Sequence, residues 1–163
     1  KEEIRNWFLF GFLARMQNTI FINRKNFKAL ESLEFINKQI SNNSALVLFP
    51  EGTTSTGKKV LSFKSSLFNL FENNSILGLQ NFSLCYTHIN SMPLDNRMRP
   101  NVAWYGEMSL LQHLKRLLSF NSIEAKLKFH PISATYGIKR KMLSEKSRNQ
   151  VIKGINSLSN NLN

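Results

Sequence analysis

The sequence of 163 residues contains a single cysteine, Cys85. A single cysteine excludes an intramolecular disulfide and favours a reducing compartment. Cys85 lies inside the apolar run 82–86, so we expect it to be a small buried core residue and not a nucleophile.

Long apolar runs and metal-ligand clusters are also missing. No run reaches the roughly 20 apolar residues that a membrane-spanning helix needs. His, Cys, Asp and Glu nowhere gather with the spacing of a metal site. We therefore expect neither a bound metal nor a cofactor.

Acidic residues are few, since 10 Asp and Glu stand against 22 Lys and Arg, for a net charge of +12. Such an excess attracts polyanions, which include nucleic acid, anionic lipid headgroups and acidic carrier proteins. Ten of the basic residues lie in 115–163, where only Glu124 and Glu145 are acidic. The sign of the charge does not choose among these partners, and a solvated basic face is the alternative without function.

Length and hydrophobic pattern predict one α/β domain over 1–163, with 42% apolar residues to build a core. A strand at 19–22, a helix at 27–40 and a strand at 45–49 form a βαβ unit, which implies a parallel pair. We therefore expect a mostly parallel sheet flanked by helices. Further along the chain, the pattern predicts the following elements: a helix at 65–72, a strand at 82–86, a helix at 110–118, a strand at 123–129, and a last helix that holds 151–158.

The run 45–55 carries the clearest functional signal. An apolar segment ends at Pro50, which has no N–H for a sheet ladder, and Gly52 permits a bend where a side chain would clash. The hydroxyls of Thr53, Thr54 and Ser55 follow. A turn of this kind after a strand is typical of anion sites in α/β proteins, so it predicts a place for a phosphate.

Two short segments resemble signature blocks of the glycerolipid acyltransferase family, specifically the lysophosphatidic acid acyltransferases. Phe49-Pro50-Glu51-Gly52-Thr53 is similar to the third block and Ile20-Phe21-Ile22-Asn23-Arg24 to the second. The resemblance implies a glycerol-3-phosphate acyltransferase-like fold and acyl transfer from acyl-carrier protein or acyl-CoA to lysophosphatidic acid, giving phosphatidic acid. It also implies a peripheral place on the cytoplasmic face of the membrane, or an anchor ahead of residue 1.

The family's catalytic pair, a His and an Asp separated by four residues, is missing from the sequence. The residues five positions after His88, His113 and His130 are Pro93, Leu118 and Thr135. We therefore expect the domain to be incomplete at its N-terminus, with catalytic residues ahead of Lys1, and inactive alone. The three histidines are interpreted as bystanders.

The binding residues are expected around the two blocks. Arg24 offers a rigid fork of donors for phosphate oxygens. Glu51 and Gly52 match the family's pair at the acceptor, while Thr53 and Thr54 donate hydroxyl hydrogens. Lys64 adds positive charge for the headgroup or for the carrier's phosphopantetheine.

Three alternatives stay open. A lyso-ornithine lipid acyltransferase would share the architecture without needing a phosphate clamp. A nucleic-acid-binding domain would use the basic C-terminal third, although its aromatic residues do not interleave with Lys and Arg, so we expect no nucleic acid. A non-catalytic lipid-binding relative is the third.

Overall fold

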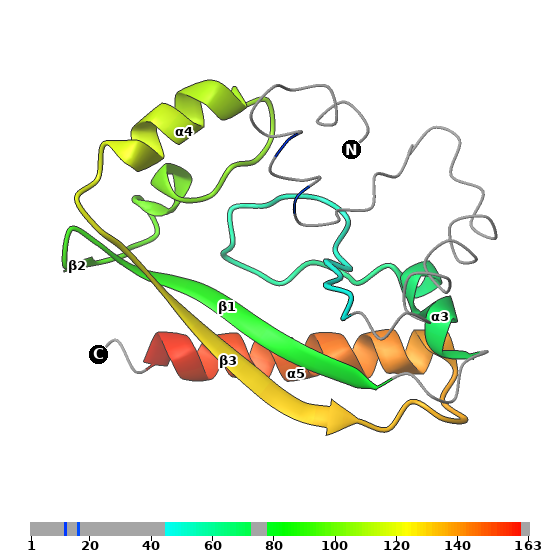
Figure 1. Cartoon of the computed structure of the whole chain (residues 1–163). Helices are drawn as coiled ribbons and strands as arrows, with labels where there is room; N and C mark the ends of the chain where they lie inside the picture. Colours follow the sequence, from blue (N-terminus) through cyan, green and yellow to red (C-terminus); the bar gives the residue numbers. More distant parts are fainter. Residues whose placement is uncertain (1–11, 13–15, 17–44, 73–77, 161–163) are drawn as a thin grey trace. The chain divides into compact units, whose positions relative to one another are not determined.

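The computed structural model describes Phe12, Met16 and residues 45–72 and 78–160 (Figure 1). The chain divides into two compact units, Lys1–Val47 and Leu48–Asn163, and the regular elements described below belong to the second. The predicted strand 19–22 and helix 27–40 lie outside the described residues. The single domain over 1–163 therefore stays a prediction.

The second unit is a small sheet with helices around it. Its elements in chain order are the 3₁₀ helix η2 (Ser65–Phe68), α3 (Asn69–Glu72), β1 (Leu79–Ile89), β2 (Met92–Pro93), the 3₁₀ helix η3 (Arg99–Asn101), α4 (Leu110–Leu118), β3 (Ile123–Ser133) and α5 (Arg140–Asn160). The helical segment 65–72, the two later strands, the helix 110–118 and the C-terminal helix are thus confirmed. The strands and the last helix are longer than predicted.

The described sheet is antiparallel, so the prediction of a mostly parallel sheet is wrong for this part of the chain. Its order is β2-β1-β3, and β1 pairs antiparallel with both neighbours. The class is mixed α/β, with helices beside a three-stranded sheet (Figure 1).

Asn90 explains why both pairings are antiparallel. Asn90 and Ser91 have φ values of 50° and 64°, which is the backbone of a two-residue hairpin turn between Ile89 and Met92. The Asn90 side-chain oxygen also accepts hydrogen bonds from the backbone N–H groups of Asn121 and Ser122, at 2.8 and 3.2 Å. The chain therefore enters β3 beside the end of β1 and has to run back along it.

Residues 45–49 have no regular secondary structure, so the strand predicted there is wrong. The apolar run has a different partner. The Phe49 ring meets the Phe82 ring edge-on, with centroids 6.4 Å apart, and Phe82 in turn contacts Phe129 on β3 at 6.2 Å. The hydrophobic side chain at 49 thus joins the face of the sheet instead of a strand ladder.

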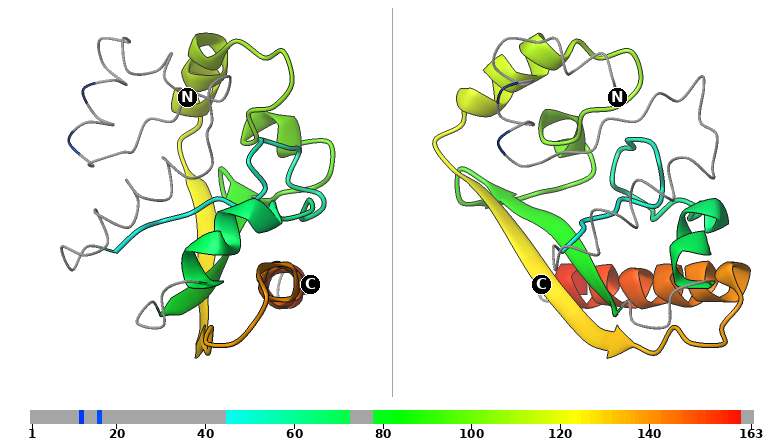
Figure 2. Two further views of the ribbon diagram at one scale, coloured as in Figure 1. Left: turned by 90° about the vertical axis from the view of Figure 1, so that its right-hand side faces the viewer. Right: turned by 45° about the vertical axis from the view of Figure 1, so that its right-hand side comes forward.

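Helix α5 packs on the opposite face of β1, where the buried side chains are small and polar (Figure 2). Asn81 donates to the Gln150 side chain at 2.7 Å, and the Ser83 hydroxyl donates to the Val151 carbonyl at 3.0 Å. Gly154 lies where a side chain would clash, because an added Cβ would sit 2.6 Å from His130 Nε2. A glycine at this position lets the helix approach the sheet closely.

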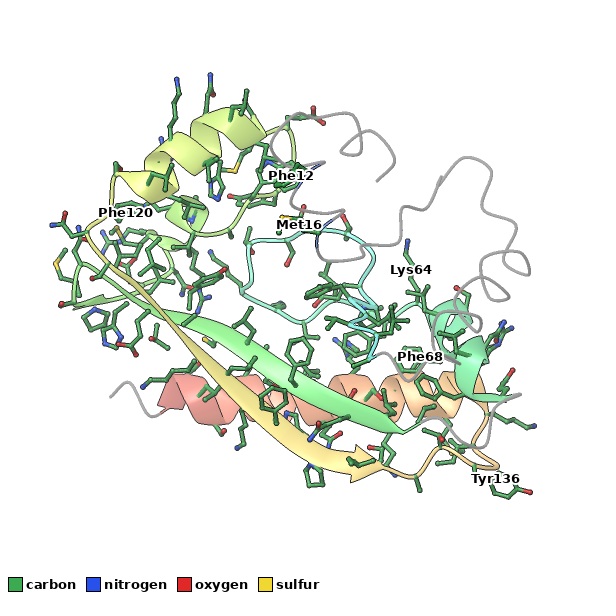
Figure 3. All side chains as sticks on the ribbon, in the orientation of Figure 1. Phe12, Met16, Lys64, Phe68, Phe120 and Tyr136 are labelled. Atoms are coloured by element: carbon green, nitrogen blue, oxygen red, sulfur yellow. The ribbon has the colours of Figure 1, made fainter. Side chains whose placement is uncertain are left out.

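The apolar core of this unit lies mainly between α5 and the η2–α3 segment. Phe68, Leu70 and Leu143 are 2%, 4% and 0% exposed, respectively, and Figure 3 shows Phe68 beside α5. Glu72 fixes the two elements further, since its carboxylate accepts the backbone N–H of Arg140 at the start of α5, at 2.8 Å. The segment that precedes η2 is therefore attached to a rigid helix pair.

Candidate functional site

The segment Phe49-Pro50-Glu51-Gly52 forms a tight turn. The N–H of Gly52 donates to the carbonyl of Phe49 at 3.1 Å, and Gly52 has a φ of +66°. This left-handed backbone strains any residue with a Cβ, which explains a glycine here. The N–H of Gly52 thus closes the turn itself.

Lys64 closes the base of the loop that follows the turn. Its N–H donates to the Pro50 carbonyl at 2.8 Å, so residues far apart along the loop are held side by side. Its carbonyl in turn accepts the N–H of Leu67, at 3.0 Å, in the first turn of η2. The loop 51–63 is therefore anchored at the start of a helical segment.

The Lys64 side chain passes directly over Gly52. A Cβ added to Gly52 would lie 2.8 Å from Lys64 Cε and 2.9 Å from Nζ. Figure 3 shows this side chain pointing away from α5. The missing side chain of Gly52 thus makes room for a lysine, and the turn gains a cation that an anionic group on a ligand would contact.

The hydroxyls beyond the turn partly serve the loop itself. Ser55 Oγ accepts the N–H of Gly57 at 3.2 Å, and Thr56 Oγ1 accepts the N–H of Lys58 at 3.4 Å. Side-chain oxygens used in this way shape a loop as backbone groups would. Thr53 and Thr54 are exposed, which leaves them as the threonines that a ligand would reach.

Arg148 holds the other end of the loop from α5. Its Nε donates to the carbonyl of Leu61 at 2.9 Å and its Nη2 to the carbonyl of Val60 at 2.8 Å. Two successive carbonyls on one guanidinium give a geometry that a lysine cannot copy. Arg148 therefore fixes the backbone three residues before Lys64.

A second arginine lies against the same loop. Arg99 Nη1 is 3.4 Å from the carbonyl of Gly57, and its buried Nε has no hydrogen-bond partner within the described part of the chain. Gly57 has a φ of +70°, and a Cβ there would meet Arg99 at 3.8 Å. Arg99 is thus the second cation, after Arg148, that meets this loop from outside.

The structure brings together most of the predicted site and leaves one residue undecided. Half-buried Glu51, Gly52 and exposed Thr53 and Thr54 share the turn, and Lys64 lies over it. Arg24 lies outside the described residues, so its meeting with Gly52 stays a prediction.

Sequence reasoning missed Arg148 and Arg99. Arg148 belongs to α5, which also carries the exposed cations Lys141, Lys146 and Lys153, and no spacing distinguishes it from them. Arg99 precedes Pro100 in a segment that we interpreted only as a loop. A half-buried arginine inside a polar stretch becomes visible only when its acceptors are placed in space.

His130 and Ser83 form a hydrogen-bonded pair that is structural. Their Nε2 and Oγ atoms are 2.8 Å apart, and the Ser83 hydroxyl donates to Val151, so Ser83 Oγ accepts the proton on Nε2. Burial, with a smaller effect of Lys128, lowers the pKa of His130, which keeps the ring neutral. Ser83 is 0% exposed, so a substrate cannot reach it.

Two carboxylates away from the turn are stabilised in their charged form. The Thr87 hydroxyl, at 2.8 Å, lowers the pKa of Glu124, helped by nearby His88 and Lys126. The backbone N–H of Met98 lowers the pKa of Asp95, which shapes the loop before η3. Both groups hold local structure.

Two absences hold for the part of the chain that the structure describes. No three His, Cys, Asp or Glu residues gather there as metal ligands. Its helices include none that combines the length and the apolar character needed to cross a bilayer.

Comparison with known proteins supports the family resemblance. The family described as Acyltransferase matches residues 1–81. The lyso-ornithine lipid O-acyltransferase of Brucella abortus is 33% identical over 93% of this chain and 60% of its own length. The protein of that name from Rhizobium meliloti is 32% identical over 79% of this chain and 47% of its own.

A second group of relatives matches a shorter part. The 1-acyl-sn-glycerol-3-phosphate acyltransferase of Neisseria gonorrhoeae is 32% identical over 42% of this chain and 27% of its own length. The chain thus spans about half the length of the relatives that match most of it, 60% and 47% in the two cases given above. None of the solved structures gives a significant match.

Proposed function

Because this chain belongs to the glycerolipid acyltransferase family, we propose that the complete protein transfers an acyl chain to the free hydroxyl of lyso-ornithine lipid. This choice of acceptor rests on how much of the chain each group of relatives matches. The relatives named for lyso-ornithine lipid match between 72% and 93% of the chain, whereas those named for 1-acyl-sn-glycerol-3-phosphate match 42%.

The charges at the turn support a zwitterionic headgroup. The headgroup of ornithine lipid carries a carboxylate and a side-chain ammonium, and the turn offers the ammonium of Lys64 over Gly52 and the carboxylate of Glu51, the residue before Gly52. Lys64 would contact the ornithine carboxylate and Glu51 the ornithine ammonium. A carboxylate and an ammonium at one turn fit a headgroup that carries both charges.

Lysophosphatidic acid is the second candidate acceptor, and one observation favours it. Two relatives that match the chain in part carry the 1-acyl-sn-glycerol-3-phosphate name. Arg24 would serve as the phosphate clamp if it lies near Gly52. The product would then be phosphatidic acid, in phospholipid biosynthesis.

The proposed reaction is direct transfer from a thioester of acyl-carrier protein or coenzyme A. A histidine removes the proton of the acceptor hydroxyl, the oxygen attacks the thioester carbonyl, and the thiolate leaves. Since no His and Asp with the family's spacing occur among the 163 residues, we assign that pair to a part of the protein beyond this sequence. The turn around Gly52 contributes positioning of the acceptor.

The test is acyl transfer by the complete protein with labelled acyl-carrier protein and labelled acyl-CoA. Each donor is offered lyso-ornithine lipid or lysophosphatidic acid in detergent micelles. We expect the higher kcat/KM with lyso-ornithine lipid. A clear preference for lysophosphatidic acid would replace the proposed acceptor by the second candidate, and no transfer to either would remove the acyl-transfer proposal.

A further inference from the structure

Helix α4 carries leucines on two sides, and the leucines at the two ends of one side are exposed. Its sequence is Leu-Leu-Gln-His-Leu-Lys-Arg-Leu-Leu. His113 is buried at 7% exposure, which identifies the side that packs inward, while Leu111 and Leu118 are 61% and 76% exposed. Since they are seven residues apart, these two leucines lie on one side of the helix, two turns from each other.

Leu114 lies between them on the same side and is half-buried. We call Leu111, Leu114 and Leu118 the outer leucine edge. A single exposed leucine is ordinary on a protein surface, but aligned exposed leucines on one short helix are not. The edge is therefore a candidate interaction surface.

One positive charge of α4, that of Lys115, borders the outer leucine edge, whereas Arg116 lies on the other side of the helix. Lys115 and Arg116 are exposed in the last turns of α4, and the helix has no acidic residue. Lys115 follows Leu111 by four residues and so lies next to it on the helix surface. Figure 1 shows α4 at the end of the sheet opposite α3.

We propose that the outer leucine edge docks on a lipid bilayer that contains anionic lipid. A helix with leucines on one side and lysine or arginine at their border lies in a membrane interface, with the leucines among the acyl chains and the cations at the headgroups. The net charge of +12 adds attraction to an anionic surface.

The inference rests on the proposed function in one respect, because an enzyme that acylates a lysolipid has to meet the bilayer that holds its acceptor. Lipid is favoured over an acidic carrier protein because exposed leucines dominate the surface, whereas one cation of α4, Lys115, borders it. The docked helix would hold the protein at the membrane interface, where the headgroup of the lysolipid acceptor lies.

The test measures binding of the whole chain to sucrose-loaded vesicles by co-sedimentation. The vesicles contain phosphatidylcholine alone or mixed with phosphatidylglycerol. Leu111→Ser with Leu118→Ser is expected to lower affinity for the mixed vesicles at least about tenfold, since each buried leucine adds several CH₂ equivalents of transfer energy. The matched control is Met142→Ser on α5, which is 63% exposed and is expected to bind as the parent does.

The charge is tested separately. Lys115→Gln is expected to weaken binding to the mixed vesicles several-fold, with a reduced salt dependence, and to leave the weak binding to phosphatidylcholine unchanged. Lys141→Gln, exposed on α5, is the control of equal charge. Equal losses in both variants would mean that total charge and not α4 binds the surface, which would overturn the proposal.

Two further outcomes would also overturn it. Unchanged vesicle binding in the leucine variant would do so directly. A lower melting temperature of that variant without vesicles would mean that the leucines pack against another part of this chain. If the leucine variant lost activity with acyl-carrier protein in detergent micelles but kept vesicle binding, the surface would belong to the carrier.

Activity separates this proposal from the function on which it rests. In the complete protein, the leucine variant is expected to keep its rate on acceptor in micelles and to lose rate on acceptor in vesicles. If the complete parent protein transfers no acyl chain but its vesicle binding depends on the leucine edge, the proposed function fails and the docking surface stands.

Discussion

The guanidinium of Arg148 donates to the carbonyl of Leu61 over 2.9 Å and so attaches α5 to the loop that ends at Lys64. The same side chain holds the carbonyl of Val60 at 2.8 Å. A helix more than 80 residues further along the sequence therefore fixes the backbone that carries the candidate ligand-binding lysine.

Arg148→Lys is expected to loosen this loop without changing the charge. A lysine can satisfy one of the two carbonyls at a time, and losing a hydrogen bond of this kind costs about 1–2 kcal/mol. We predict a several-fold higher KM for the acceptor in the complete protein with little change in kcat. Lys146→Ala, at an exposed position of the same helix, is the control, and an equal effect in both variants would contradict a role for the loop.

Gly52→Ala is expected to weaken acceptor binding, whereas the equivalent change Gly106→Ala is not. Gly52 and Gly106 have similar φ values, +66° and +61°, so alanine brings the same backbone strain of about 1–2 kcal/mol to both. At Gly52 the new methyl would also displace Lys64, while at Gly106 nothing lies within 4 Å. Thermal melts and acceptor KM should show similar destabilisation of the two variants but a loss of acceptor binding only in Gly52→Ala.

Gly154→Ala is expected to destabilise the protein although alanine is the better helix former. Alanine gains up to about 1 kcal/mol of helix propensity, but its methyl meets Ser83 Oγ and His130 Nε2, and overpacking of a buried contact costs about 1–3 kcal/mol or more. Lys153→Ala, one residue earlier and exposed, should be neutral or slightly stabilising. Urea unfolding that leaves Gly154→Ala as stable as the parent would show that the helix and sheet are not in close contact.

The stability of the protein is expected to fall on mild acidification because of His130. Burial lowers the pKa of this histidine below its ordinary value of 6.5, so the unfolded chain binds the proton more readily than the folded one. The stabilisation that depends on neutral His130 is therefore complete above pH 6.5, and it is lost as the pH falls from 6.5 through the folded-state pKa. Over this range the free energy of unfolding decreases by at most about 1.4 kcal/mol per pH unit.

The matched variant is His130→Gln, which keeps a donor for Ser83 and does not titrate. Denaturant unfolding between neutral and mildly acidic pH should give a flatter dependence in His130→Gln than in the parent. Parallel curves for the two proteins would assign the acid sensitivity to other groups.

The amphipathic segments were predictable from sequence, and the strand pairing was not. The leucines of 110–118 and the alternation along 123–129 identify α4 and β3 because each repeats with the period of its element. The antiparallel order depends on Asn90 and Ser91, whose left-handed backbone forms the hairpin, and on the Asn90 side chain, which contacts the residues before β3. Asn-Ser is a weaker turn signal than Asn-Gly and does not stand out in the sequence.

The apolar run 45–49 shows how local pattern misleads. Short apolar runs suit a buried strand, but they also suit any segment that packs one side chain against a sheet. Phe49 is 70% exposed and meets Phe82 edge-on, so the run contributes a ring contact to the sheet and no strand. The motif still located the turn at Gly52 and its contact with Lys64, because both are local properties of the chain.

The most direct test of the account is the acceptor KM of Lys64→Met in the complete protein, because Lys64 is the cation that lies over Gly52. Methionine keeps most of the stem and removes the charge. With lyso-ornithine lipid in micelles, we predict a KM about tenfold higher or more at nearly constant kcat, and no change for Lys59→Met in the same loop. Parent-like constants in Lys64→Met would contradict the claim that this turn binds the acceptor headgroup.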